Sequence, residues 1–271
     1  MRRERIGLSG TKEYENIDQF LYSRRRSGAH AIKIGNQWLD ILFENRGSDT
    51  TLVAFHGAAS DRIRTLPYFT GRGTAESLGW NLIALSDPSL TLGEVDLAWF
   101  IGNRVLGLLH KKLSPLIHHL LSATHPVLFG GSGGAYAAIW FGQDFPGSSV
   151  VVFNPRLNLS APPKAAMLTY LRVCHKSERP VSLRTIRRNF VTEDLGEFYS
   201  TGLPFDIHII QNSGDKQFLR NQTQPFIKRH ANDPRLHVKI DYFGGGHNAV
   251  IPQRFLQDYL LSVRSVSGIV Q

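Results

Sequence analysis

The chain alternates between short apolar runs and longer stretches in which apolar residues recur at helical spacing. The short runs are rich in β-branched and aromatic residues, as strands are, and the longer stretches have the three-to-four-residue period of amphipathic helices. The expected strands are Thr51–Phe55, Asn81–Ser86, Pro126–Phe129, Ser149–Phe153, Asp206–Gln211 and Leu236–Tyr242. The expected helices are Val105–Leu121, Ala135–Gln143, Phe218–His230 and Ile251–Val263.

This order of elements predicts an α/β fold, because strands that alternate with helices form a mostly parallel sheet covered by helices on both faces. Ala31–Ile34 and Trp38–Phe43 flank Gly35-Asn36 and are expected to pair as a hairpin that begins the sheet. Residues 1–30 are polar and basic and are predicted to be a partly ordered lead-in. The core is then expected over residues 31–155 and 205–271, and residues 156–204 form an insertion.

A glycine-rich turn, Gly130-Gly131-Ser132-Gly133-Gly134, follows one expected strand and precedes a helix. So tight a turn needs residues without Cβ. Strand, turn and helix together match G-x-S-x-G, the nucleophile elbow that holds a serine oxygen exposed above a sheet. A dinucleotide loop would need glycine where Tyr136 stands, and a phosphate-binding loop would need a lysine. A plain glycine-rich connection stays open as the alternative.

Candidate partners for Ser132 lie further along the chain. Asp215 ends the turn Asn-Ser-Gly-Asp after a late strand, and His247 ends the loop Phe-Gly-Gly-Gly-His after the next. The order serine, aspartate, histidine differs from the orders of the chymotrypsin and subtilisin types. Asp215 could instead be an ordinary turn residue.

Other acids and histidines fit these roles less well. Asp87 comes too early in the chain to be the acid, and Asn154, after another strand, has no carboxylate. Among the 11 histidines, His110, His118 and His119 fall within an expected helix. Only His247 combines a glycine loop, a preceding strand and the right order.

With the motif His56-Gly57-Ala58 after the first central strand, the chain resembles the α/β-hydrolase superfamily over roughly residues 31–265. The resemblance implies that the backbone N–H groups of Ala58 and Gly133 form an oxyanion hole and that His56 and Gly57 shape its loop. It also implies that residues 156–204 form a helical cap over the serine.

Three short stretches resemble hydrolase-like proteins of bacterial surface-polysaccharide and accessory-secretion pathways, some of which are acetyltransferases. They are Ser86–Leu90, Ala98–Gly102 and Phe153–Arg156. The expected activity is a serine hydrolase that cleaves carboxylic esters through an acyl-enzyme. An acyltransferase or thioesterase with the same triad, acting for example on surface polysaccharide, is the alternative. A non-enzymatic scaffold is the third, and a complete set of triad residues argues against it.

Composition narrows the remaining possibilities. The 271 residues are 42% hydrophobic and 20% charged, as in ordinary globular chains, and α/β folds often use this length for one domain. No run approaches the length of a membrane span and no secretory signal is recognisable, so the simplest expected location is the cytoplasm. The lone cysteine, Cys174, cannot form an internal disulfide. No metal-ligand spacing is present, and neither a metal nor a cofactor is expected.

The chain is basic, with 31 Lys and Arg against 22 Asp and Glu and a net charge of +9. This charge favours anionic partners in general, but no nucleic-acid motif accompanies it and no nucleic-acid partner is expected. The insertion 156–204 itself carries a net charge of +4, with Arg184, Arg187 and Arg188 clustered. A basic cap would favour small anionic acyl substrates. The sequence does not predict the oligomeric state.

Overall fold

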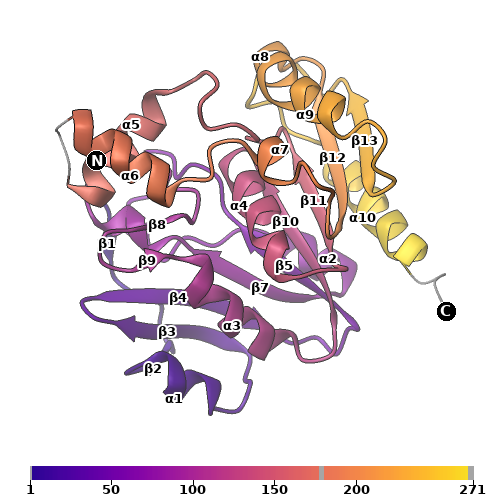
Figure 1. The fold of residues 1–271 in the computed structure, drawn as a ribbon. Coiled ribbons are helices and arrows are strands. Elements are labelled where there is room, and N and C mark those ends of the chain that lie inside the picture. Colours follow the sequence, from indigo (N-terminus) through magenta and orange to yellow (C-terminus); the bar gives the residue numbers. More distant parts are fainter. Residues whose placement is uncertain (1, 177–179, 268–271) are drawn as a thin grey trace.

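A nine-stranded sheet runs through the molecule and carries helices on both faces (Figure 1). The computed structural model describes residues 2–176 and 180–267. All neighbouring strands are parallel except the two pairs that involve β4, which confirms the predicted mostly parallel sheet. In spatial order the strands are β13 (Leu236–Asp241), β12 (Asp206–Asn212), β11 (Ser149–Phe153), β10 (His125–Gly131), β5 (Thr50–Phe55), β7 (Asn81–Ser86), β4 (Gln37–Glu44), β3 (Gly28–Ile34) and β2 (Lys12–Tyr14).

The central strands are buried on both faces, which explains their unbroken apolar runs. Every residue of β5 and of β7 is buried, as expected for parallel strands between two helical layers. The register places Gly130 beside Phe55 and Gly131 beside Phe153, so β5, β10 and β11 end together. The loops that leave these carboxyl ends therefore meet at one edge of the sheet.

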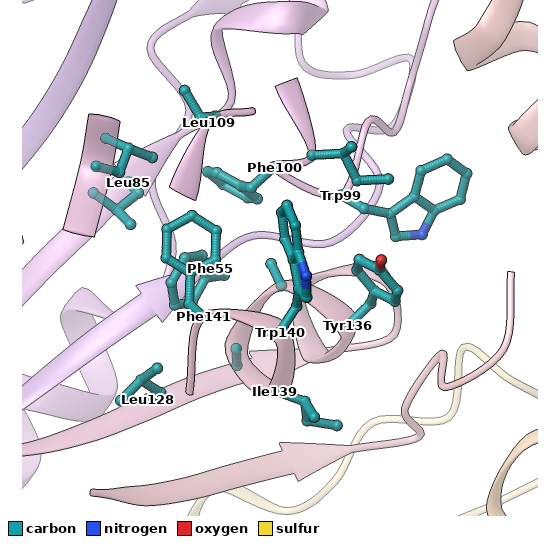
Figure 2. Close-up of a cluster of buried hydrophobic side chains, with 14 of the residues drawn as sticks. Phe55, Leu85, Trp99, Phe100, Leu109, Leu128, Tyr136, Ile139, Trp140 and Phe141 are labelled. Carbon is teal, nitrogen blue, oxygen red and sulfur yellow. The ribbon is translucent and has the colours of Figure 1, made fainter. Parts of the chain in front are cut away.

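Two hydrophobic cores lie on the two faces of the sheet. The helices that contribute to these cores are α1 (Ile17–Leu21), α2 (Arg72–Leu78), α3 (His110–Leu121), α4 (Gly133–Phe141), α5 (Ala165–His175), α9 (Gln224–Arg229) and α10 (Gln253–Ser267), and α6 spans Pro180–Phe190. One core contains side chains of α1, α3, α4, α5 and α9, and the other contains side chains of α2 and α10. The helix α4 is buried along its whole length, and its Phe141 packs against Phe55, which packs in turn against Phe100 (Figure 2). None of the described helices is both long and apolar enough to cross a membrane.

The first thirty residues are more integrated than a lead-in. β2 is the outermost strand of the sheet beside β3, and β1 (Glu4–Arg5) pairs with β6 (Thr65–Leu66). Phe20 of α1 is buried in the core. The polar composition of this segment concealed these contacts, because single buried residues create no periodic pattern.

Several predicted boundaries are confirmed within a few residues. Two predicted helices differ from the observed ones, one in its start and one in being divided. The hairpin predicted around Gly35-Asn36 is β3 and β4, paired antiparallel. The helix predicted from Val105 begins only at His110, because Gly107 takes a left-handed conformation and lies in β9 (Gly107–Leu108), which pairs with β8 (Gly102–Asn103). The helix predicted over 218–230 is split into α8 (Lys216–Phe218), a π-helical turn η3 (Leu219–Thr223) and α9.

The segment predicted as a cap, residues 156–204, leaves the sheet after β11 and returns to it at β12. We call this segment the excursion. It contains α5, α6 and α7 (Leu195–Phe198), and an antiparallel bridge between Asn158 and Asp194 closes its base. The Asn158 amide also donates to the Asp194 carboxylate, over 2.8 Å. Tyr170 of α5 is fully buried and its hydroxyl donates to the carbonyl of Gly102. The excursion is thus fixed both at its base and along α5.

Candidate active site

Ser132 stands at the turn between β10 and α4 in a strained backbone conformation, with φ 52° and ψ −114°. Its N–H donates to the carbonyl of Phe153, and its own carbonyl accepts from the N–H of Arg156. These bonds tie the turn to the end of β11. Backbone strain of this kind persists only where the surroundings impose it, and it is frequent at functional sites.

The glycines beside Ser132 allow the backbone of the turn to approach its neighbours closely. A Cβ on Gly134 would lie 2.2 Å from the carbonyl oxygen of Phe55, and one on Gly131 would lie 2.1 Å from the ring of Phe153. Neither separation is compatible with a side chain. The glycine pattern therefore reflects packing of the turn against β5 and β11.

Ser132, His247 and Asp215 form a continuous hydrogen-bonded chain. The Ser132 hydroxyl lies 2.8 Å from Nε2 of His247, and Nδ1 of the same ring lies 2.5 Å from Oδ2 of Asp215. Because a carboxylate can only accept, the ring proton belongs on Nδ1, which leaves Nε2 to accept from the serine. Such an arrangement can take a proton from the hydroxyl while the carboxylate stabilises the imidazolium.

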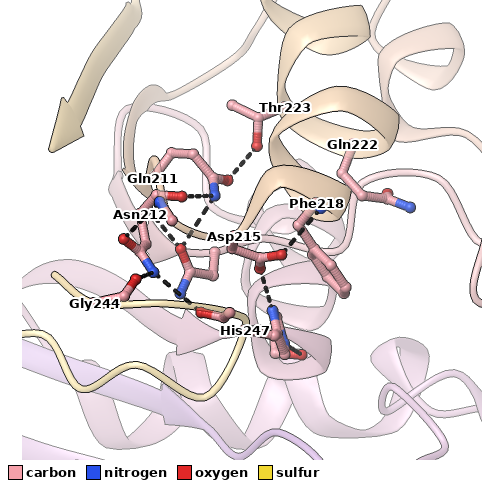
Figure 3. A network of polar contacts seen from close by, with 12 residues as sticks. Gln211, Asn212, Asp215, Phe218, Gln222, Thr223, Gly244 and His247 are labelled. Carbon is pink, nitrogen blue, oxygen red and sulfur yellow. Dashed lines mark hydrogen bonds and ion pairs between the residues drawn. The ribbon is translucent and has the colours of Figure 1, made fainter. Parts of the chain in front are cut away.

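The aspartate and histidine are held from several sides. Asp215 is 3% exposed and caps α8, where its second oxygen accepts from the N–H of Phe218. The Phe218 ring in turn stacks on His247, with ring centroids 3.9 Å apart. One short helix therefore fixes the carboxylate and supports the imidazole (Figure 3).

Asn212, at the end of β12, joins the two loops that carry Asp215 and His247 (Figure 3). Its amide nitrogen donates to the carbonyls of Gly244 and Gly246 in the histidine loop. Its amide oxygen accepts from the N–H of Gly214 in the aspartate turn and of Phe243. A single side chain thus sets the positions of both loops.

A second layer of amides supports Asn212. The side-chain oxygen of Asn154 accepts from the backbone N–H of Asn212 and from the amide of Gln211. Thr223 donates to the other amide atom of Gln211. Neither asparagine was predicted as a supporting residue, since Asn154 has no carboxylate to serve as the acid and Asn212 stands in a sequence typical of a turn. An Asn at a strand end beside two loops was the available signal.

The loop His56-Gly57-Ala58 lies beside the serine. The Nδ1 atom of His56 donates to the Gly57 carbonyl over 2.7 Å, and its Nε2 accepts from the N–H of Asp87 over 3.0 Å. Burial lowers the pKa of His56 to about 4, so this ring is neutral and serves to shape the loop. Gly57 and Ala58 border the same cavity as Ser132. Gly133 is the first residue of α4, where the helix offers its N–H no acceptor.

Arg3 anchors the far side of this loop, and no sequence pattern predicted it. Its side chain is buried, and its guanidinium donates to the carbonyls of Ala59, Ile63 and Val95 and to the carboxylate of Asp96. The N–H of Ala59 donates to the carbonyl of Asp96. The start of the chain therefore holds the segment that follows Ala58.

A cavity of about 570 Å³ opens in front of Ser132 and His247. No Lys, Arg, Asp or Glu of the described residues borders it, and none of its lining residues comes from 156–204. A cap over the serine and a preference for anionic substrates therefore remain predictions. The apolar and aromatic walls of the cavity are formed by Phe55, Tyr68, Phe129, Phe153, Val250, Ile251 and Leu256. Among residues 2–176 and 180–267, no three His, Cys, Asp or Glu side chains are grouped as a metal site would require.

Comparison with solved structures identifies the fold. A capsule O-acetyltransferase of Neisseria meningitidis serogroup A superposes with a TM-score of 0.60 and 15% identity over 90% of this chain and 97% of its own. An esterase of Pyrococcus furiosus gives 0.57 and 16% over 90% and 92%. An esterase of Thermogutta terrifontis gives 0.55 and 14% over 89% and 100%.

No protein-family model and no curated protein sequence matches the chain. The likeness is thus one of structure, and it agrees with the nucleophile elbow and the order of elements along the chain. The chain has the α/β-hydrolase fold that its motifs predicted.

Proposed function

We propose that this protein is a serine-dependent enzyme that cleaves carboxylic esters through an acyl-enzyme. The observation that carries the proposal is the 2.8 Å contact between the Ser132 hydroxyl and Nε2 of a His247 ring bound to Asp215. In this mechanism His247 removes the hydroxyl proton as the serine oxygen attacks the ester carbonyl. The N–H groups of Ala58 and Gly133 stabilise the resulting oxyanion.

His247 then donates the proton to the leaving alcohol, the bond between the carbonyl carbon and that alcohol breaks, and the acyl group stays on Ser132. Water, deprotonated by the same imidazole, attacks the carbonyl carbon of the acyl-serine. The bond between that carbon and the serine oxygen breaks, His247 returns the proton to this oxygen, and the carboxylic acid leaves. Asp215 fixes the ring orientation in both halves and stabilises the imidazolium. No other chemical group is required.

The cavity supports a neutral acyl group as substrate. Its lining is mainly apolar and aromatic, and ligand cavities of a few hundred Å³ typically bind apolar groups through such walls. The basic residues of 156–204 do not line the cavity, so their charge could act on a substrate only outside it. We therefore expect short to medium neutral acyl chains to be preferred over anionic ones.

An acyltransferase is the second candidate, and the likeness to the capsule O-acetyltransferase favours it, since a variant of that enzyme was solved with CoA. The two activities share every step up to the acyl-serine and differ in the acceptor, water or an alcohol. With acetyl-CoA or p-nitrophenyl acetate as donor and oligosaccharides as acceptors, the ratio of free acetate to acetylated sugar separates them.

The decisive experiment is labelling with a fluorophosphonate probe together with turnover of a p-nitrophenyl ester. Ser132→Ala should abolish labelling and lower turnover by on the order of 10⁵-fold or more, while leaving the circular dichroism spectrum unchanged. Ser200→Ala, at an exposed serine that does not border the cavity, serves as control and should keep both activities. Equal labelling of the Ser132→Ala variant would refute the proposal.

A further inference from the structure

Among the described residues, the last strand of the sheet, β13, has a neighbour on one side only. It lies at the outer margin of the molecule (Figure 1). Val238, Ile240 and Tyr242 are 36, 45 and 68% exposed, and their two-residue spacing places them on one face. Lys239 and Asp241 lie on the other. Proteins normally protect an open edge that carries apolar side chains, because it can pair with another chain.

Within residues 2–176 and 180–267, no other strand pairs with the outer side of β13. The N–H of Ile207 donates to the carbonyl of Arg235, and that of Ser213 donates to the carbonyl of Asp241. In a parallel ladder alternate residues point their backbone groups at the neighbouring strand, so the residues between them point theirs outward. Val238 and Ile240 therefore present N–H and C=O groups at the edge.

We propose that a second copy of this chain pairs with the edge, β13 against β13, antiparallel about a twofold axis at Ile240. Ile240 then lies opposite its own copy, and Val238 lies opposite Tyr242. Lys239 lies opposite Asp241 of the other copy, twice by symmetry. Apolar side chains thus meet on one face of the joined sheet and opposite charges meet on the other, as favourable cross-strand pairs require.

The charge pattern selects this register among its neighbours. An axis at Lys239 would place that lysine opposite its own copy, and an axis at Asp241 would do the same with two carboxylates. Like charges directly opposite are destabilising. An axis at Val238 would set Lys239 opposite His237 and Tyr242 opposite Pro234, which has no N–H to donate. The axis at Ile240 avoids each of these conflicts.

A twofold contact of this kind is isologous and closed, so it yields a dimer and not a fibre. It would join two sheets into one that continues across both molecules. Within one chain the Lys239 ammonium and the Asp241 carboxylate lie 3.7 Å apart, and their side chains are 49 and 47% exposed, so each can also face the opposite charge of the other copy. Their contribution should therefore weaken in high salt.

Charge reversal provides the first test, by sedimentation of the full chain. The unaltered protein should be a dimer. Lys239→Asp and Asp241→Lys each create two like-charged oppositions, and each should weaken the dimer at least about tenfold. An equimolar mixture of the two variants should dimerise again, because every opposition in the mixed pair is complementary. The double variant with both changes should also dimerise.

The mixture distinguishes a lost interface from a lost fold, since misfolded chains cannot restore each other's pairing. Tyr22→Lys, at an exposed position of the opposite sheet edge, is the matched surface control and should leave the dimer intact. A monomeric unaltered protein would overturn the proposal. So would single variants that dimerise normally, or a mixture that remains monomeric.

Disulfide trapping tests the register. Cross-strand pairs of this type have Cα atoms about 4.5–5.5 Å apart, within reach of a disulfide. An equimolar mixture of Lys239→Cys and Asp241→Cys should therefore form a covalent dimer on mild oxidation. Either variant alone should form little, because each cysteine is then two residues out of step with its copy. Efficient cross-linking of Lys239→Cys alone would refute the axis at Ile240.

Discussion

Asn212 shows how much of the candidate site depends on single side chains other than Ser132, Asp215 and His247. Its amide makes hydrogen bonds to both the aspartate turn and the histidine loop, and it is fully buried. Without it, the carbonyls of Gly244 and Gly246 lose their donors. The distance between Asp215 and His247 is therefore set partly by a residue that contacts neither side chain.

We predict that Asn212→Ala lowers kcat by about 10- to 100-fold, since a misplacement of about 1 Å in a catalytic group costs roughly this much. Unfolding in urea should show a loss of about 2 kcal/mol from the unpaired buried groups. Asn232→Ala, at an exposed position, is the control and should change neither value. An Asn212→Ala variant with full kcat would show that the loops keep their geometry unaided.

Gly134 provides a second test at the residue scale. Because a Cβ there would lie 2.2 Å from the Phe55 carbonyl oxygen, Gly134→Ala must displace α4 from β5. We expect a loss of about 1–3 kcal/mol of stability and a fall in ester turnover, measured by urea unfolding and initial rates. Gly73→Ala is the matched control.

Gly73 lies within α2, where nothing lies within 4 Å of an added Cβ and φ is not positive. Alanine there should stabilise the protein by about 0.5–1 kcal/mol, because it is the better helix former. If both substitutions had the same effect, close approach would not be the reason for glycine at Gly134.

At the scale of elements, the start of the chain supports the segment after the loop His56-Gly57-Ala58 from outside the sheet. Arg3 is 1% exposed, and its guanidinium donates to four carbonyls and to Asp96; one of those carbonyls belongs to Ala59. Arg3→Ala should lower the free energy of unfolding by about 3 kcal/mol, because the buried carbonyls lose their donor. It should also lower kcat. Urea unfolding and ester turnover measure the two effects.

Arg2→Ala is the control for this prediction, since Arg2 is exposed. It removes the same charge one residue away and should leave stability and kcat unchanged. Equal losses in the two variants would mean that net charge, and not the buried hydrogen bonds of Arg3, stabilises this part of the molecule.

Sequence patterns predicted the strands and helices in which burial imposes a regular spacing of apolar residues. β5 and β7 read as apolar runs because both faces are covered, and α4 read as a helix after the glycine turn. The same patterns gave wrong boundaries where a single residue determines the local structure. Gly107 places a short strand before α3, and the π-helical turn at Leu219–Thr223 has no periodic signature.

For the candidate site, the sequence predicted the three central residues but not the residues that support them. Order along the chain and the glycine loops pointed to Ser132, Asp215 and His247. The supports that position them, Asn212, Phe218 and Arg3, belong to long-range contacts that the sequence alone does not encode in any local spacing.

At the scale of the whole molecule, buried neutral histidines link stability to pH. Burial lowers the pKa of His56, His175 and His208 to about 4, against 6.5 for an exposed imidazole. Between pH 6.5 and 4 the unfolded chain therefore binds more protons than the folded one, and stability must fall as the pH falls. Above pH 6.5 these groups contribute no slope.

We predict that the free energy of unfolding in urea decreases from pH 6.5 to pH 4.5 by about 1 kcal/mol per pH unit for each such histidine. His208→Phe should flatten this slope, because one of the titrating groups is removed. His118→Phe, at an exposed position remote in sequence from His208, is the control. A slope that His208→Phe leaves unchanged would contradict the assignment for that ring.

The bridge between Asn158 and Asp194 has a practical consequence for protein engineering. It pins both ends of the excursion side by side, so lengthening or shortening the chain between them changes the closure entropy only slowly. Libraries that randomise the exposed positions of this stretch can then vary its surface while its buried residues and the scaffold that holds Ser132 stay unchanged.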